Sequence, residues 1–152
     1  MSPMFYSIVV SAALFGQAMP DVDTARARSI HAATKQLGAK EYTARESASR
    51  ELWRYGLAAE PALKKAASSP DAETRSRAMR LLRDFEYGIL PGVPLGVRQK
   101  IRSFRDGNHA QHQQSLQWLV EKQQFVVLER LVRFEPDPQI RRSLLVQLFQ
   151  SS

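Results

Sequence analysis

The chain has 152 residues, of which 43% are hydrophobic and 24% are charged, so its length and composition are those of one globular domain rather than of a disordered protein. It contains no cysteine, which excludes disulfides, cysteine-ligated zinc and thiol catalysis. Lys and Arg exceed Asp and Glu by 7, which favours an anionic partner: nucleic acid, a membrane surface or an acidic protein. The alternative is that these cations only solvate the outer faces of helices.

The first eighteen residues predict an export signal. An apolar run from Phe5 to Phe15 is followed by Gly16-Gln17-Ala18, which gives small residues at the positions preferred for cleavage. Residues 1–4 lack the usual Lys or Arg. We therefore expect a signal peptide over 1–18, a mature domain over 19–152 without a membrane span, and a periplasmic or extracellular location. A buried first helix or an uncleaved anchor is the alternative, and the protein would be cytoplasmic if 1–18 is not a signal.

Helical periodicity runs through the chain after Asp21, and no strand-like alternation competes with it. In the first half it predicts helices over 22–37, 43–55, 59–67 and 72–87. Thr43 and Glu46 are expected to form a capping box, in which each side chain satisfies a free backbone donor of the other. Asp71 is expected to cap the fourth helix. The predicted inward-facing residues of the first helix are Val22, Ile30, Ala33 and Leu37.

A Gly- and Pro-rich stretch over 88–96 interrupts this pattern and cannot be helical through its centre. We interpret it as an ordered apolar connector between two halves, 21–87 and 95–150, joined by 88–94. A partner-binding strap is the alternative interpretation. In the second half, the periodicity predicts helices over 95–105, 109–122, 124–134 and 138–149.

The two halves resemble each other at a spacing of 66 residues. The segment Ser69-Pro70-Asp71-Ala72-Glu73-Thr74-Arg75 returns as Glu135-Pro136-Asp137-Pro138-Gln139-Ile140-Arg141. Shifting the helices predicted over 43–55, 59–67 and 72–87 by the same distance places them on the last three predicted helices. Self-similarity at a fixed spacing is typical of stacked helical repeats, in which neighbouring units bury a continuous core.

These repeats resemble the HEAT-like family, including HEAT-like segments of exported planctomycete-type proteins. The resemblance is carried by Gly56-Leu57-Ala58-Ala59-Glu60-Pro61-Ala62-Leu63, by Pro70 to Arg75, and by Asp137-Pro138-Gln139-Ile140-Arg141-Arg142. It implies an all-α, armadillo-like, right-handed α-solenoid of about seven to eight short helices in two similar halves. It also implies that Arg75 and Arg141 belong to a hydrogen-bond ladder. Because Ser69 and Glu135 replace the family's first Asp, Asp71 and Asp137 are better explained as helix N-caps.

Few residues carry a chemical signal. His109 and His112 have the spacing of two metal ligands on one helix face, but no third ligand stands nearby in the sequence. There is no nucleophile elbow, phosphate-binding loop or zinc-protease motif. We therefore expect no catalytic residue, no metal and no cofactor, and we expect the protein not to be an enzyme. A HEAT-like lyase or glycosylase would need a polar cluster in a cleft.

Two arginine trios are the candidate interaction surface, because each stays on one side of its predicted helix: Arg77, Arg80 and Arg83, then Arg98, Arg102 and Arg105. With Trp53 and Trp118 accessible, such a surface could bind the phosphates of nucleic acid and stack its bases. Both tryptophans neighbour core leucines, however, and are expected to pack between repeats. The expected function is therefore a non-catalytic protein–protein interaction or scaffold module, with a basic nucleic-acid-binding repeat protein as the alternative.

Overall fold

The computed structural model describes residues 22–150, and these residues form an all-helical fold without a strand. The helices are α1 (Val22–Gln36), α2 (Tyr42–Tyr55), a short 3₁₀ helix η1 (Gly56–Ala59), α3 (Glu60–Ala66), α4 (Ala72–Glu86), α5 (Leu95–Asp106), α6 (His109–Glu121), α7 (Phe125–Phe134) and α8 (Pro138–Gln150). None of these helices is long and apolar enough to cross a membrane. The predicted signal peptide lies outside the described residues.

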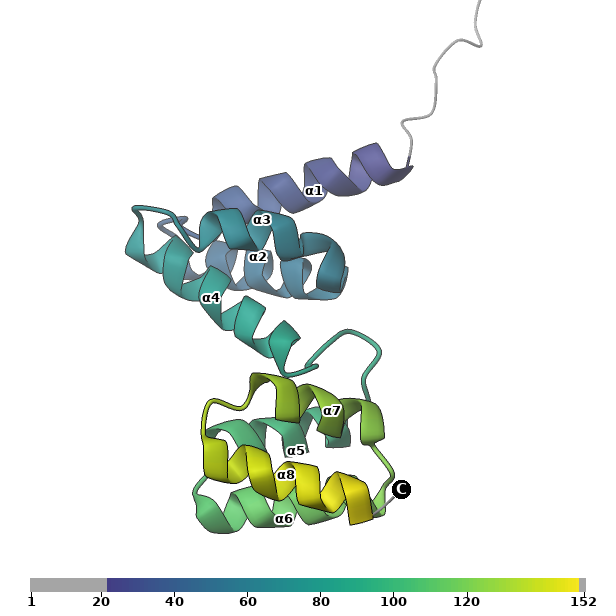
Figure 1. Cartoon of the computed structure of the whole chain (residues 1–152). Helices are drawn as coiled ribbons and strands as arrows, with labels where there is room; N and C mark the ends of the chain where they lie inside the picture. The colour runs from purple at the N-terminus through teal and green to yellow at the C-terminus, as the bar shows by residue number, and fades with distance from the viewer. Residues whose placement is uncertain (1–21, 151–152) are drawn as a thin grey trace, which may run out of the picture.

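Consecutive helices pack in pairs, and the pairs form two halves. In the N-terminal half, α1 packs on α2 and α3 on α4, while α1 also contacts α3 and α2 contacts α4. In the C-terminal half, α5 packs on α6 and α7 on α8, and α6 contacts both helices of the last pair. Figure 1 shows α4 descending from the N-terminal half, with α5 and α7 nearer to it than α6 and α8.

Each half has its own hydrophobic core. The N-terminal core contains Leu52 and Leu63, which are fully buried, together with Ile30, Ala33, Leu37, Ala48, Ala59, Ala66, Ala78, Leu81 and Phe85. The C-terminal core is built around Phe104, Leu119 and Leu131, and it also takes in Tyr87 and Ile89 from the connector. The division between the two cores therefore falls at the end of α4, between Phe85 and Tyr87.

The 66-residue repeat is visible in the backbone of three helices. Shifting α2, α3 and α4 by 66 residues places them on α6, α7 and α8 to within two residues at the ends. The turns before α4 and α8 also match in detail. Arg75 Nη1 donates to the carbonyl oxygen of Ser69 at 2.7 Å, and Arg141 Nη2 donates to that of Glu135 at 2.6 Å. These two arginines thus hold the turn that precedes their own helix.

The N-caps of these two helices also match. The Asp71 carboxylate accepts a hydrogen bond from the Thr74 backbone N–H at 2.7 Å, and that of Asp137 accepts one from the Gln139 N–H at 2.7 Å. Both contacts satisfy backbone donors that the first turn of a helix leaves free. Asp71 and Asp137 are therefore N-caps, as predicted.

Two local predictions are wrong. The capping box expected at Thr43 and Glu46 does not form, because α2 starts one residue earlier, after Glu41, and the Glu46 carboxylate accepts a hydrogen bond from Arg77 Nη1 at 2.6 Å instead. Val22, expected to face inward, is 72% exposed. It lies in the first turn of α1, whereas the buried residues of that helix begin with Ile30, nearer to the packed end.

The connector between α4 and α5 joins the halves through a few specific contacts. Trp53 of α2 donates through Nε1 to the carbonyl oxygen of Ile89 at 3.3 Å, and the guanidinium of Arg98 lies 5.0 Å from the centre of the Trp53 ring. Arg105 of α5 donates to the Asp84 carboxylate of α4 at 2.6 Å. No two described helices from different halves pack along each other extensively. Within residues 22–150, no helix of the C-terminal half packs extensively along α4.

Candidate interaction surface on α4

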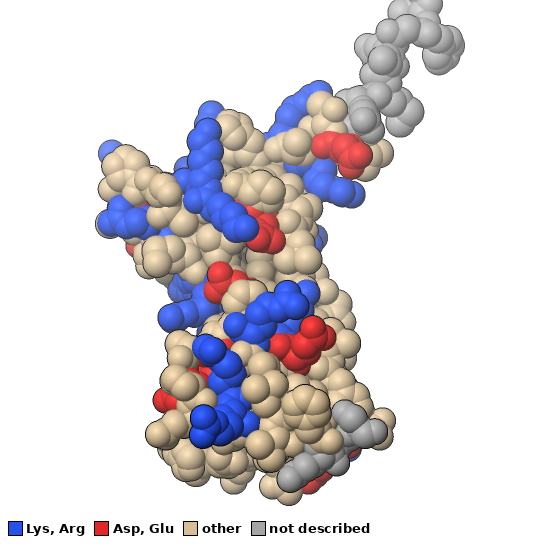
Figure 2. Space-filling view, in the orientation of Figure 1, with Lys and Arg blue, Asp and Glu red and all other residues tan. Residues whose placement is uncertain are grey.

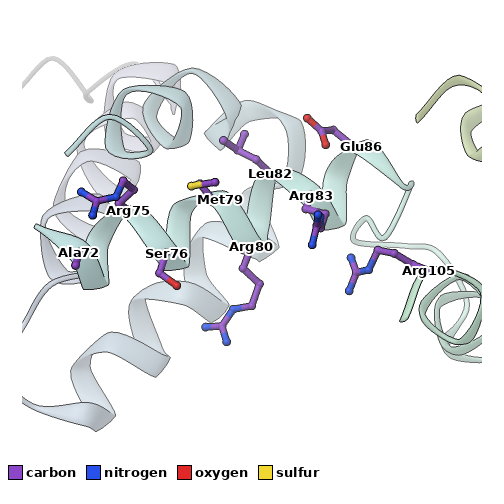
Figure 3. A pocket seen from close by; sticks show the side chains of 9 residues that line it. All are labelled: Ala72, Arg75, Ser76, Met79, Arg80, Leu82, Arg83, Glu86 and Arg105. Carbon is purple, nitrogen blue, oxygen red and sulfur yellow. The ribbon is translucent and has the colours of Figure 1, made fainter. Parts of the chain in front are cut away.

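A hollow with a volume of about 780 Å³ lies along the uncovered side of α4. It is lined by Ala72, Arg75, Ser76, Met79, Arg80, Leu82, Arg83 and Glu86 of α4 and by Arg105 of α5. We call the α4 residues of this set the outer face of α4. In Figure 3, Met79 and Leu82 lie on one side of the helix, Arg80 extends from the other side, and Arg105 approaches from the neighbouring helix.

The outer face has the spacing of a helix-packing surface. Ala72, Ser76, Met79, Arg83 and Glu86 follow one another at steps of four, three, four and three residues. This spacing keeps side chains on one side of an α-helix and is the spacing by which helices pack on one another. The opposite side of α4 is buried in the N-terminal half through Ala78, Leu81 and Phe85. Helix α4 therefore buries one face in the N-terminal core. Its outer face also has the residue spacing of a helix-packing surface, but it remains uncovered in residues 22–150.

The centre of the outer face is apolar and exposed. Met79 has 56% of its surface exposed, and Leu82 is half-buried beside it. Methionine is a flexible, polarisable side chain that adapts to different partner surfaces. The sequence analysis missed Met79, although the four-three spacing of the residues around it was a signal that could have found it.

Arg80 and Arg83 are the two free cations of the outer face. Both are exposed, and neither makes a hydrogen bond or ion pair with another described residue. The other two arginines are held in place at opposite ends of the hollow. Arg75 donates to the Ser69 carbonyl, and Arg105 is bound between Asp84 and Asp106 at 2.6 and 2.8 Å. The predicted residues Arg80, Arg83 and Arg105 are thus brought together around one hollow.

Arg77, which was predicted to belong to the same surface as Arg80 and Arg83, instead stabilises the packing of α4 on α2. Its side chain is only 8% exposed and pairs with Glu46 of α2 at 2.6 Å and with Glu73 of α4 at 2.5 Å. It also donates to the Ser49 hydroxyl at 3.3 Å. Arg77 therefore ties α4 to α2 on the buried side of the helix and takes no part in the open hollow.

The three arginines of the second predicted trio do not form one surface, because each lies in a different environment. Arg98 is half-buried over the Trp53 ring, Arg102 is exposed with its Nη2 3.7 Å from Asp84, and Arg105 lies at the end of the hollow. Neither tryptophan has the accessible ring face on which a nucleic-acid base was predicted to stack. Both are half-buried against the cores, and Lys100 lies 5.9 Å from the Trp118 ring centre. Cations of the chain itself thus occupy positions at which a nucleic-acid base would stack.

The remaining charge is dispersed. Figure 2 shows Lys and Arg over both halves, with Asp and Glu beside several of them. Ion pairs such as Lys64–Glu60 at 2.7 Å are of the exposed helical type that solvates a surface. The outer face of α4 differs from these regions because two free arginines there lie beside an exposed apolar side chain, Met79.

The histidine pair does not assemble a metal site in the described residues. The His112 ring stacks on Phe104 with 5.2 Å between ring centres, in a hollow of about 240 Å³ that His109 and Asp137 also line. Within residues 22–150, no group of three or more His, Cys, Asp or Glu side chains could hold a metal ion. The His112 ring instead packs on the C-terminal core through Phe104.

Comparisons of the chain with protein-family models, curated proteins and solved structures give no match. The geometry of the described residues is therefore the basis on which a function is inferred.

The Arg77 network predicts that stability falls in acid. Glu46 and Glu73 each have a pKa below the ordinary value of 4.5 because each carboxylate accepts a hydrogen bond from Arg77. A carboxyl group whose pKa is lower in the folded state contributes stability that is complete above pH 4.5 and is lost as the pH falls through the folded value. The free energy of unfolding should therefore decrease as the pH falls below about 5.

Arg77→Gln tests this assignment by urea denaturation across that pH range. The variant should be less stable at neutral pH, and its stability should change less steeply in acid because the two carboxyl groups lose the hydrogen bond that is the main cause of their lowered pKa. Arg28→Gln is the control, since Arg28 is an exposed arginine of α1. Equal acid slopes for Arg77→Gln and the wild-type chain would contradict the assignment.

Proposed function

We propose that this chain is a non-catalytic protein–protein interaction module that binds its partner on the outer face of α4. The supporting observation is the open helix-packing face, in which the exposed Met79 and the half-buried Leu82 lie beside the two free arginines, Arg80 and Arg83. Exposed apolar groups within a polar rim are typical of protein-binding surfaces, and Met and Arg are both enriched there.

We also propose that the chain is a HEAT-like, right-handed solenoid whose stack is interrupted after α4. The pairing of consecutive helices, the 66-residue repeat and the matching turns at Arg75 and Arg141 support this. In an uninterrupted stack, the next repeat would cover the outer face of α4. The connector over 88–94 carries the second half away, so the interruption itself creates the open surface.

Site-specific photo-crosslinking tests the proposed function. A photoreactive amino acid placed at Met79 in the full chain, in cells of the source organism, should form a crosslink to a defined protein. The same residue at Gln114, an exposed position on α6, is the control and should give no crosslink to that protein. Crosslinks to nucleic acid from position 79 would favour the nucleic-acid alternative. Identical products from both positions would contradict a specific site on α4.

A further inference from the structure

We propose that the partner presents an acidic amphipathic helix to the outer face of α4, with apolar side chains against Met79 and Leu82 and carboxylates against Arg80 and Arg83. This inference rests on the proposed function and adds the chemical class of the partner. Three properties of the surface support it: its periodicity, its unbalanced charge and its apolar centre.

The periodicity favours a helix as the binding element. Residues on the outer face recur every three or four positions along a helix of 15 residues, or about 22 Å of length. At the N-terminal end, Ala72 and Ser76 are small and exposed, so that a second helix can approach the α4 backbone closely there. A partner helix of about four turns would cover the whole face, in the helix-in-groove manner of amphipathic helix recognition.

The charge favours acidic side chains on that helix. Four arginines line the hollow against a single glutamate, Glu86. Arg105 is already neutralised by Asp84 and Asp106, whereas Arg80 and Arg83 have no ion-pair partner in the part of the chain that the structure describes. Because these two are three positions apart on α4, two carboxylates three or four positions apart on a facing helix could pair with both.

The apolar centre favours a protein over a phosphate backbone. Met79 is 56% exposed and Leu82 is half-buried beside it, and a nucleic-acid strand bound to the arginines would not bury this apolar surface. An amphipathic helix would bury them, and this burial contributes favourable free energy in addition to the ion pairs. Like charges at the same positions would repel, so the arginines also exclude basic helices and provide specificity.

Selection from a library of random 16-residue peptides displayed on phage tests the inference with the full chain as bait. The enriched peptides should carry negative net charge, with acidic and apolar residues at helical spacing. Synthetic peptides from the enriched set should bind Arg80→Glu/Arg83→Glu at least tenfold more weakly than the wild-type chain. The matched control is Arg28→Glu/Arg142→Glu, which makes the same change in net charge at exposed positions away from α4 and should bind normally. Arg80→Gln/Arg83→Gln should give a smaller loss and replaces the Glu variant if that variant misfolds.

The outcomes separate the inference from the proposed function. Neutral or basic peptides that lose binding in Met79→Glu would overturn the acidic-helix inference while supporting α4 as a protein-binding surface. Acidic peptides that bind the α4 variants and the wild-type chain equally would also overturn the inference. Failure to enrich any peptide whose binding depends on Met79, Arg80 or Arg83, combined with no crosslink from position 79, would overturn the proposed function itself.

Discussion

Leu52→Ala should lower the free energy of unfolding of the N-terminal half by about 3 kcal/mol, because it leaves a cavity at the centre of a close-packed core. Leu52 is 0% exposed and belongs to the cluster that joins α1, α2, α3 and α4. The cores of the two halves are separate clusters of buried residues. The amides that lose protection against hydrogen exchange should therefore be those of α1–α4.

Amide hydrogen exchange resolves this effect by residue. In Leu52→Ala, the slowly exchanging amides of α1–α4 should exchange about 100-fold faster or more, whereas those of α5–α8 should change far less. Leu119→Ala is the matched variant, since Leu119 is also 0% exposed but lies in the C-terminal core. In this variant, the amides of α5–α8 should exchange faster, whereas those of α1–α4 should change far less. Equal acceleration throughout the chain in both variants would show instead that the halves unfold as one cooperative unit.

Trp53→Ala should weaken the connection between the halves and cost about 2 kcal/mol, less than a fully buried tryptophan because the side chain is half-buried. The substitution removes the hydrogen bond to the Ile89 carbonyl and the ring beneath Arg98. It therefore removes contacts of α2 with both the connector and α5. In urea denaturation followed by circular dichroism, the unfolding transition should be broader than that of the wild-type chain, because the coupling between the halves is weaker.

Trp118→Ala provides the control for this prediction. Trp118 is also half-buried beneath a cation, but its contacts lie within the C-terminal half, against that core and beside Lys100 of α5. It should reduce stability without broadening the transition. If Trp118→Ala broadens the denaturation curve as much as Trp53→Ala, the Trp53 contacts do not couple the halves.

Most of the helices were predictable because their determinants are local. Pro61 in the first turn of α3, Gly56 after α2 and Asp71 before α4 occupy the positions that the sequence indicates. Gly56 has φ 57°, a conformation that residues with a side chain seldom adopt. The capping box was expected at the wrong helix, however: Asn108 and Gln111 form one at the start of α6, while Glu46 of α2 pairs with Arg77.

The arginines show where such local reasoning ends. The spacing of Arg77, Arg80 and Arg83 placed them on one side of a helix, but it could not show which of them meets another helix. Arg77 meets Glu46, which is 31 residues away in the sequence, and becomes buried. Arg80 and Arg83 form no ion pair within residues 22–150 and remain exposed. A difference of only three residues along α4 thus separates a structural arginine from a candidate binding residue.

The all-helical class, the helix positions and the caps at Asp71 and Asp137 could be predicted from the sequence, because each depends on residues within a few turns of one another. The 66-residue repeat followed from comparing such local patterns along the chain. That the core is divided after Phe85 and that α4 keeps an open face could be seen in the three-dimensional arrangement alone. Both depend on the path of the connector over 88–94, and this path is set by long-range contacts such as Trp53 with Ile89 and Tyr87 with the Phe134 carbonyl. Periodicity indicates which side of a helix can pack, whereas the position of the neighbouring half decides whether that side is covered.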